Sequence, residues 1–156
     1  MTRGDLVLVD TNVYLSATDR SRPDHQDSQD FLRRCVCTGI HSAITGQIVR
    51  EYLVAATRPL AVNGLGLQPL DALSNVETFR RRAVFLDESE SVSRRLEELV
   101  RRLGLAGKKI HDANIAAVLA VYNVPYLITA NTDDFAPFEH IAPLTPAEAL
   151  AALPGG

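Results

Sequence analysis

The stretch Leu6-Val7-Leu8-Val9, followed directly by Asp10, decides the fold of this chain. Its four residues are all apolar and branched, which is typical of a short strand that is buried on both faces. Strands of this kind belong to parallel sheets that helices cover on both sides. Asp10 is therefore expected at the C-terminal end of the first strand.

Beyond this stretch, short strands alternate with helices along the chain. The strand candidates are 40–45, 83–86, 126–129 and a less regular stretch at 140–142. Apolar residues at three- and four-residue spacings predict helices over 30–38 with the turn before it, 47–57, 70–82, 89–103 and 111–123. A capping pattern predicts a short last helix that begins at Thr145-Pro146-Ala147-Glu148. This alternation predicts an α/β domain with a mainly parallel central sheet of four to five strands.

The composition favours an ordinary globular protein, with 46% hydrophobic and 22% charged residues. No internal repeat or linker interrupts the chain, so residues 1–156 are expected to form a single domain. No apolar run approaches the roughly 20 residues of a membrane-spanning helix, and Asp5 and Asp10 come before a signal-peptide core could form. Cys35 and Cys37 are too few for a disulfide framework or a zinc site. We therefore expect a cytoplasmic protein without membrane contacts, in which both cysteines are reduced packing residues.

The net charge of -3 argues against binding of nucleic acid by bulk attraction. The charge is unevenly placed, however, because residues 80–109 hold nine of the 16 basic residues and only five of the 19 acidic ones. A basic middle segment that faces an acidic remainder could grip phosphate groups beside a metal-binding centre. The alternative is that these charges form ordinary solvated helix faces.

Acidic and amide side chains follow the predicted strands or begin the helices after them. In chain order they are Asp10, Glu51, Asp112, Asn131, Asp133 and Asp134. Because ligands bind outside the C-terminal ends of the strands in an open α/β sheet, these side chains are expected to converge on one crevice. Two like charges about 4 Å apart repel by roughly 4 kcal/mol at an effective dielectric near 20, so a cation has to compensate. Hard oxygen ligands with few histidines nearby select Mg²⁺ or Mn²⁺.

Each acid also has a plain structural explanation. An aspartate at position 112, near a helix start, can cap that helix and suits its dipole. The run Asp10-Thr11-Asn12 can simply end a strand and start a helix. Glu51 lies beside an apolar stripe, where it has either a partner or a metal, or else faces solvent.

Four segments in this order carry a resemblance to a known family: 9–15, 48–53 followed by 57–59, 110–117 and 127–135. They read Val-Asp-Thr-Asn-Val-Tyr-Leu, Ile-Val-Arg-Glu-Tyr-Leu with Thr-Arg-Pro, Ile-His-Asp-Ala-Asn-Ile-Ala-Ala and Leu-Ile-Thr-Ala-Asn-Thr-Asp-Asp-Phe. Together they resemble the PIN-domain family, and within it the VapC-type toxins of bacterial toxin–antitoxin pairs. The resemblance implies a three-layer α/β/α domain and a Mg²⁺- or Mn²⁺-dependent endoribonuclease.

The resemblance also implies roles for individual residues. Asp10, Glu51 and Asp112 are the acidic triad of the family, and Thr11 and Asn12 flank the first acid. The fourth acidic position is open, because Asn131 stands where many PIN domains have an acid. Its amide oxygen can coordinate a metal but adds no charge. Asp134 matches a recurrent family acid, and Asp133 is a nearby substitute.

From these roles we hypothesise that Asp10 and Asp112 hold the principal ion and that Glu51 positions or deprotonates a water molecule. The metal shell is completed by Asn131 and Asp134, and Thr129 or Thr11 hydrogen-bonds a ligand or the scissile phosphate. The candidates for contacts with RNA are Thr11, Arg50, Arg58, Lys108 and Lys109, and for the basic ones ordinary surface charge is the alternative. His111 is expected to be a structural hydrogen-bonding residue.

The resemblance further implies a small antitoxin protein as partner and a homodimer. A groove for an apolar helix of a partner would use Phe31, Leu32, Leu53 and Val54, although core packing is the alternative for most of them.

Two rival functions compete with a nuclease. A phosphohydrolase of the haloacid-dehalogenase type needs a second aspartate two residues after Asp10, where this chain has Asn12. A PIN fold that binds RNA or protein without cutting would not need the full set of acids.

Overall fold

The computed structural model describes residues 1–154, and its centre is a five-stranded sheet. The strands are parallel throughout and lie in the order β3-β2-β1-β4-β5. In chain order they are β1 Leu6–Val9, β2 His41–Thr45, β3 Ala83–Leu86, β4 Tyr126–Ile128 and β5 Ala142–Leu144. The first strand is buried as predicted, since Val7, Leu8 and Val9 are fully buried.

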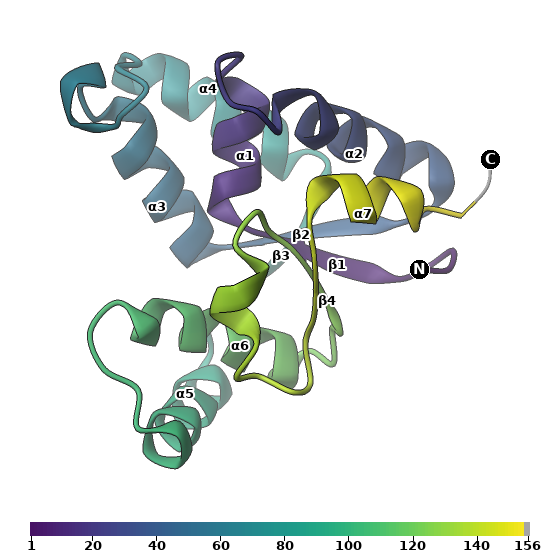
Figure 1. Ribbon diagram of the computed structural model, residues 1–156, viewed down its shortest axis with the longest axis vertical. Coiled ribbons are helices and arrows are strands. Elements are labelled where there is room, and N and C mark those ends of the chain that lie inside the picture. Colours follow the sequence, from purple (N-terminus) through teal and green to yellow (C-terminus); the bar gives the residue numbers. More distant parts are fainter. Residues whose placement is uncertain (155–156) are drawn as a thin grey trace.

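Helices cover both faces of this sheet, as Figure 1 shows. The helices are α1 Thr11–Thr18, α2 His25–Thr38, α3 Gly46–Thr57, α4 Pro69–Arg80, α5 Glu90–Leu103, α6 Lys109–Val121 and α7 Pro146–Ala151, with short 3-10 turns η1 Leu60–Val62 and η2 Thr132–Phe135. One face carries α1, α2, α4 and α7, with α3 packed on α1 and α4, and the other face carries α5 and α6 (Figure 1). The expected three-layer α/β/α arrangement is therefore confirmed.

Helix α1 is not among the helices predicted from apolar spacing, although the alternative that Asp10-Thr11-Asn12 ends a strand and starts a helix is confirmed. Its residues Val13, Tyr14, Leu15 and Ser16 are all buried, so the helix lacks the polar face that produces a recognisable amphipathic pattern. Helix α2 begins at His25 and thereby includes the turn that was expected before position 30. The last helix begins as predicted, because Thr145 and Glu148 form a complete capping box.

Three other details differ from the expectations. The last strand lies at 142–144 instead of 140–142, because Phe138 and Ile141 turn into the core before the ladder with β4 starts at Ala142. Helix α6 begins at Lys109, so Asp112 lies in its first turn and does not cap it. Cys35 is a buried packing residue as expected, but Cys37 is exposed. Both thiols are free. Within residues 1–154 no helix is long and apolar enough to cross a membrane.

Candidate active site

The strand order brings three chain segments together at the C-terminal end of the sheet. Strand β1 lies between β2 and β4, and each of the three leads into a candidate segment. Asp10 directly follows β1 and is the N-cap of α1, while α3 follows β2 and carries Glu51. Thr129 follows β4, and the first turn of α6, which carries Asp112, approaches from the opposite face of the sheet (Figure 1). The segments that carry Asp10, Glu51, Asp112 and Thr129 therefore meet at this end of the sheet.

Asp10 is held by three hydrogen bonds from neutral donors. Its Oδ1 accepts from the backbone N–H of Thr11 at 2.7 Å. Its Oδ2 accepts from the Asn12 side-chain amide at 2.7 Å and from the Thr129 hydroxyl at 2.7 Å. The Asn12 side chain also contacts the segment after β4, where its Oδ1 accepts a hydrogen bond from the backbone N–H of Ala130 at 3.0 Å. Asp10 thus both starts α1 and joins β1 to β4.

Burial makes the charge of Asp10 costly. The residue is 8% exposed, and this burial is the largest cause that raises its pKa to about 6. The hydrogen bonds from Thr129 and Thr11 lower the pKa, and the negative charges of Glu51 and Asp112 raise it further. The three acids of the expected triad are therefore close enough to interact electrostatically.

Glu51 is fixed at both carboxylate oxygens. Its Oε2 accepts from the Thr11 hydroxyl at 3.0 Å, and its Oε1 accepts from the Gln47 side-chain amide at 2.8 Å. His111 Nδ1 lies 3.8 Å from the same Oε1. Gln47 is 4% exposed and was not singled out from the sequence. The available signal was its position one helical turn before Glu51, where a side chain faces the same side of the helix.

Asp112 lies nearer the protein surface than Asp10. Partial burial raises its pKa, and the charge of Asp134 raises it further, whereas Lys109 opposes this shift. The Lys109 ammonium group donates to Asp134 Oδ1 at 2.8 Å, and this contact raises the pKa of the lysine. Asp134 is therefore close to Asp112, and it already has a cationic partner.

The other two candidates for the fourth position are less closely tied to the acids. Asn131 is the N-cap of η2, and its backbone N–H donates to the Thr129 hydroxyl at 3.1 Å, but its side chain is exposed. Asp133 is exposed as well. Of the three, Asp134 is the one that influences the pKa of Asp112.

The basic candidates lie around a cavity next to Glu51. This cavity of about 390 Å³ is lined by Arg50, Arg58 and His111 together with Thr11 and Glu51, and by Gln47, Val54 and Ala55. The guanidinium group of Arg50 also forms an ion pair with Glu88 at 3.4 Å. Lys108 is exposed at the N-cap of α6.

The basic segment expected to grip phosphate forms α5 in part, and two of the four arginines of this helix pair with its own acids. Arg94 pairs with Glu90 at 2.6 Å, and Arg95 pairs with Glu98 at 2.9 Å, each within one helical turn. Arg80 lies over the ring of Phe85, 5.1 Å from its centroid. These contacts favour the alternative of a solvated helix face for this part of the segment.

The donor chemistry of the acidic site suits a hard divalent cation. Asp10 Oδ1 accepts a single hydrogen bond and keeps a lone pair free, and a cation beside it would relieve the cost of its buried charge. The side chains are not drawn together around a common point. Within residues 1–154, no group of three His, Cys, Asp or Glu residues is arranged to hold a metal ion as it stands.

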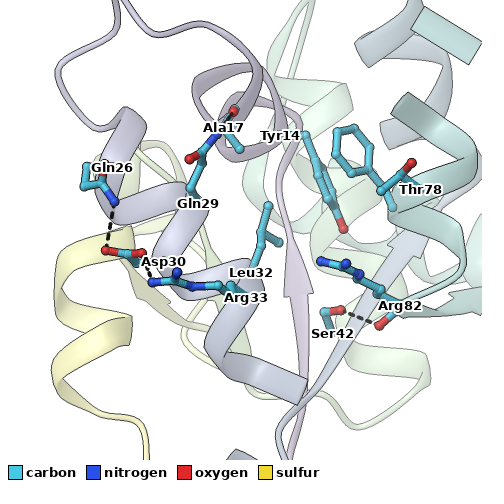
Figure 2. Close-up of a pocket in the computed structure, with 11 residues that line it drawn as sticks. Tyr14, Ala17, Gln26, Gln29, Asp30, Leu32, Arg33, Ser42, Thr78 and Arg82 are labelled. Atoms are coloured by element: carbon cyan, nitrogen blue, oxygen red, sulfur yellow. Dashed lines mark hydrogen bonds and ion pairs between the residues drawn. The ribbon is translucent and has the colours of Figure 1, made fainter. Parts of the chain in front are cut away.

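A second hollow of about 390 Å³ lies away from the acids, between α1, α2 and the end of α4. Figure 2 shows Gln29, Leu32 and Arg33 of α2 on one side of it, and Tyr14, Thr78 and Arg82 on the other. Among the described residues, the buried Tyr14 hydroxyl has no hydrogen-bond partner. The partner groove considered above is not formed as such, because Phe31 is in the core while Leu32 and Val54 line different hollows.

Comparison with known proteins gives consistent results. The PIN domain family model matches residues 7–142. Ribonuclease VapC24 of Mycobacterium tuberculosis is 28% identical over 134 residues, which cover 85% of this chain and 91% of the relative. VapBC2 from Rickettsia felis, solved bound to a DNA fragment from its promoter, has a similar chain with a TM-score of 0.68 and 17% identity, covering 90% of this chain and 98% of that one. DNA-bound VapBC from Salmonella typhimurium gives a TM-score of 0.64 at 19% identity, with 94% and 99% coverage. At these identities the two structures establish a likeness of fold.

Proposed function

The chain belongs to the PIN domain family, and from this premise we propose that it is a divalent-metal-dependent endoribonuclease, the toxin of a toxin–antitoxin pair. The observation that carries the proposal is Asp10, a buried carboxylate whose pKa is raised to about 6 and whose neighbours Glu51 and Asp112 are also acids. Near neutral pH a site of this kind concentrates negative charge that a bound divalent cation would offset. The similarity to a protein named as a ribonuclease supports the choice of RNA as substrate.

We propose that Asp10 and Asp112 hold the ion, Mg²⁺ or Mn²⁺, and that Asn131 and Asp134 support it. A divalent ion bound there lowers the pKa of water and offsets charge on the phosphate oxygens. The free lone pair on Asp10 Oδ1 makes this oxygen the candidate ligand, because Oδ2 already accepts two hydrogen bonds. Asp134 is a weaker candidate than Asp10, since it already binds Lys109.

Glu51 is proposed to take the proton of the attacking water. Its side chain is 35% exposed, so the carboxylate is open to solvent and to substrate. The Thr11 hydroxyl and the Gln47 amide fix the orientation of the carboxylate plane. A base that is held in one orientation loses less entropy when it meets its substrate.

The RNA backbone is proposed to lie in the cavity beside Glu51. Arg50, Arg58 and His111 line this cavity and offer donors to phosphate oxygens, and Val54 offers an apolar surface for a sugar or a base. Thr11 lines the same cavity, so its hydroxyl joins the substrate surface to the Glu51 carboxylate. Lys108 and Lys109, at the start of α6, are proposed to contact more distant phosphates.

The partner is proposed to be a small antitoxin protein, because chains of similar fold occur in the solved VapBC structures. The hollow between α1 and α2 is the proposed docking surface, since Leu32 and Phe79 line it together with polar and charged side chains. Co-expression with the small reading frame next to this gene should give a complex that co-purifies. A homodimer is part of the same proposal, and light scattering of the purified protein measures it.

Two rival functions are less well supported. A haloacid-dehalogenase-type enzyme would need an aspartate at position 12 that acts as acid and base. Here the residue is Asn12, and its side-chain amide joins Asp10 to Ala130. A covalent aspartyl-phosphate trapped with fluoroberyllate would revive that alternative. A PIN fold that only binds RNA would not need a buried carboxylate at Asp10, whose charge is costly to bury.

The deciding experiment is RNA cleavage by the purified protein with Mg²⁺ or Mn²⁺ and with excess chelator. We expect cleavage that needs the ion and that Asp112→Asn abolishes. Cleavage that survives in chelator, or in the Asp112→Asn variant, would overturn the mechanism. Sequencing of the new RNA ends after brief expression then identifies the target RNA.

A further inference from the structure

Gln47 and Asn114 form a partly buried amide bridge between the two helices that carry Glu51 and Asp112. Gln47 lies in the first turn of α3, is 4% exposed, and precedes Glu51 by one helical turn. Asn114 lies on α6, two positions after Asp112. The Asn114 amide donates to Gln47 Oε1 at 2.7 Å across a separation of 67 residues.

Every polar atom of the Gln47 side chain is in use. Its Nε2 donates to Glu51 Oε1 at 2.8 Å and to the backbone carbonyl of His111 at 3.1 Å. Its Oε1 accepts from Asn114. The amide therefore has one favourable orientation, because the flipped amide would place its oxygen against the Glu51 carboxylate and its NH₂ group against the Asn114 donor.

The start of α3 is held from a further side by Glu88, in the connection between β3 and α5. A carboxylate oxygen of Glu88 accepts from the backbone N–H of Gln47 at 2.5 Å. The other oxygen pairs with Arg50 at 3.4 Å. A carboxylate at this place compensates the N-terminal dipole of α3 and fixes the first turn from which both Gln47 and Glu51 project.

From this geometry we infer that Gln47 and Asn114 are positioning residues that set the orientation of the Glu51 carboxylate relative to the helix that carries Asp112. The inference rests on the proposed nuclease function. Thr11 holds one Glu51 oxygen and Gln47 holds the other, so loss of Gln47 frees the carboxylate to rotate about its remaining contact. The contact to the His111 carbonyl and the bond from Asn114 both tie Gln47 to α6, and thus to the first turn that carries Asp112.

The test compares Gln47→Ala, Asn114→Ala and the double variant in the full-length protein. Removal of residues that orient metal ligands typically costs about 10- to 100-fold in metal affinity or activity. We expect a decrease of this size in kcat with Mn²⁺, with KM for RNA little changed. Because the bridge also holds the first turn of α6, which carries the proposed ligand Asp112, we expect weaker Mn²⁺ binding as well. Calorimetry or electron paramagnetic resonance measures this binding independently of cleavage. Because the two residues act through one bridge, the double variant should be no worse than the more affected single variant.

The matched control is Asn75→Ala. The Asn75 amide donates to the Tyr52 hydroxyl at 2.9 Å and so joins α4 to α3, the same helix, but on a side that does not touch the acids. This variant should keep the wild-type kcat and Mn²⁺ affinity, even if its melting temperature falls. Gln47→Glu keeps the size and an acceptor but places a carboxylate against Glu51, and it should not rescue activity.

The outcomes separate this inference from the proposed function. If the wild type cleaves RNA and both alanine variants keep its kcat and Mn²⁺ affinity, the positioning role is overturned. A bridge that is merely structural would lower stability alone, in all three helix-joining variants alike. If the wild type binds Mn²⁺ without cutting RNA, the nuclease function fails, and weaker Mn²⁺ binding by Gln47→Ala still supports the positioning role. A wild-type protein that neither binds Mn²⁺ nor cuts RNA would overturn both.

Discussion

The acidic site has an inner half and an outer half that handle negative charge in different ways. In the inner half, Asp10 is 8% exposed and receives hydrogen bonds from neutral donors. In the outer half, Asp134 is bound by the ammonium group of Lys109, and these side chains are 45% and 50% exposed. Water and salt screen the outer charges, whereas burial leaves the inner charge unscreened. We therefore expect changes near Asp10 to have larger effects than changes at the outer pair.

The largest expected effect belongs to Glu51, which lies between the two halves. Glu51→Gln keeps the side-chain size but removes the proposed proton acceptor. General-base catalysis contributes roughly 10²- to 10⁴-fold, so kcat for RNA cleavage should fall by about that factor. Single-turnover kinetics with saturating Mn²⁺ measure it. Glu77→Gln, which removes an exposed pair with Arg81, serves as the control. Wild-type kcat in Glu51→Gln would assign the base to another group.

The second prediction sharpens the contrast in burial through its pH dependence. The pKa of Asp10 is about 6 in the folded protein, against 3.8 for an ordinary aspartate. Folding therefore favours the protonated form, and the contribution of Asp10 to stability is complete below pH 3.8 and is lost as the pH rises through 6. A difference of this size corresponds to about 3 kcal/mol in the free energy of unfolding.

Urea unfolding in chelator, from pH 4 to pH 7.5, tests this expectation. The stability of the wild type relative to Asp10→Asn should fall across this range, because Asn does not titrate. Added Mn²⁺ should restore part of the wild-type stability at the upper end. If the stabilities of the wild type and Asp10→Asn changed in parallel with pH, the pKa of Asp10 would not be raised by folding.

A smaller effect is expected at Thr129, which supports Asp10 without being an acid. Its hydroxyl donates to Asp10 Oδ2 and accepts from the Asn12 amide at 3.0 Å and from the backbone N–H of Asn131. Thr129→Val removes this junction and should reduce cleavage by about 10- to 100-fold. Thr129→Ser keeps the hydroxyl and should retain most of the activity. Equal losses in the two variants would point to packing instead of hydrogen bonding.

The smallest effect is expected in the outer half. An exposed ion pair contributes at most about 1 kcal/mol, which limits the change in stability for Lys109→Met. Since Lys109 no longer holds Asp134 in this variant, apparent Mn²⁺ affinity should rise by no more than about fivefold. Calorimetry measures this change, and Lys108→Met at the exposed N-cap of α6 is the control. A loss of Mn²⁺ affinity in Lys109→Met would contradict the expectation that Lys109 competes with the ion for Asp134.

Local sequence pattern predicted most of the fold, and the misses have physical causes. Strands β1 to β4 were found because apolar runs and strand ends are local features. Helix α1 was missed since burial on nearly all sides leaves it without a polar face. Strand β5 was displaced because only the packing of Phe138 and Ile141 decides where the ladder begins.

The candidate site shows the same division. The acidic residue types and their places after strands were visible in the sequence, and the fold brings Asp10, Glu51 and Asp112 within electrostatic reach of one another. The sequence did not distinguish among Asn131, Asp133 and Asp134, whereas the structure brings Asp134 close to Asp112. Gln47 was missed because its place one turn before Glu51 is a weak signal by itself, and its contacts with α6 follow only from the packing of the two helices.

By itself, the sequence determined the parallel α/β architecture and the acidic character of one end of the sheet. Both follow from hydrophobic periodicity and from residue type, which are properties of short stretches of chain. Only the tertiary structure decided which distant polar side chains meet at the site, such as Thr129 with Asp10 across 119 residues and Asn114 with Gln47 across 67. A hydrogen bond depends on a few tenths of an ångström and on direction, and these are set by how the helices pack on the sheet.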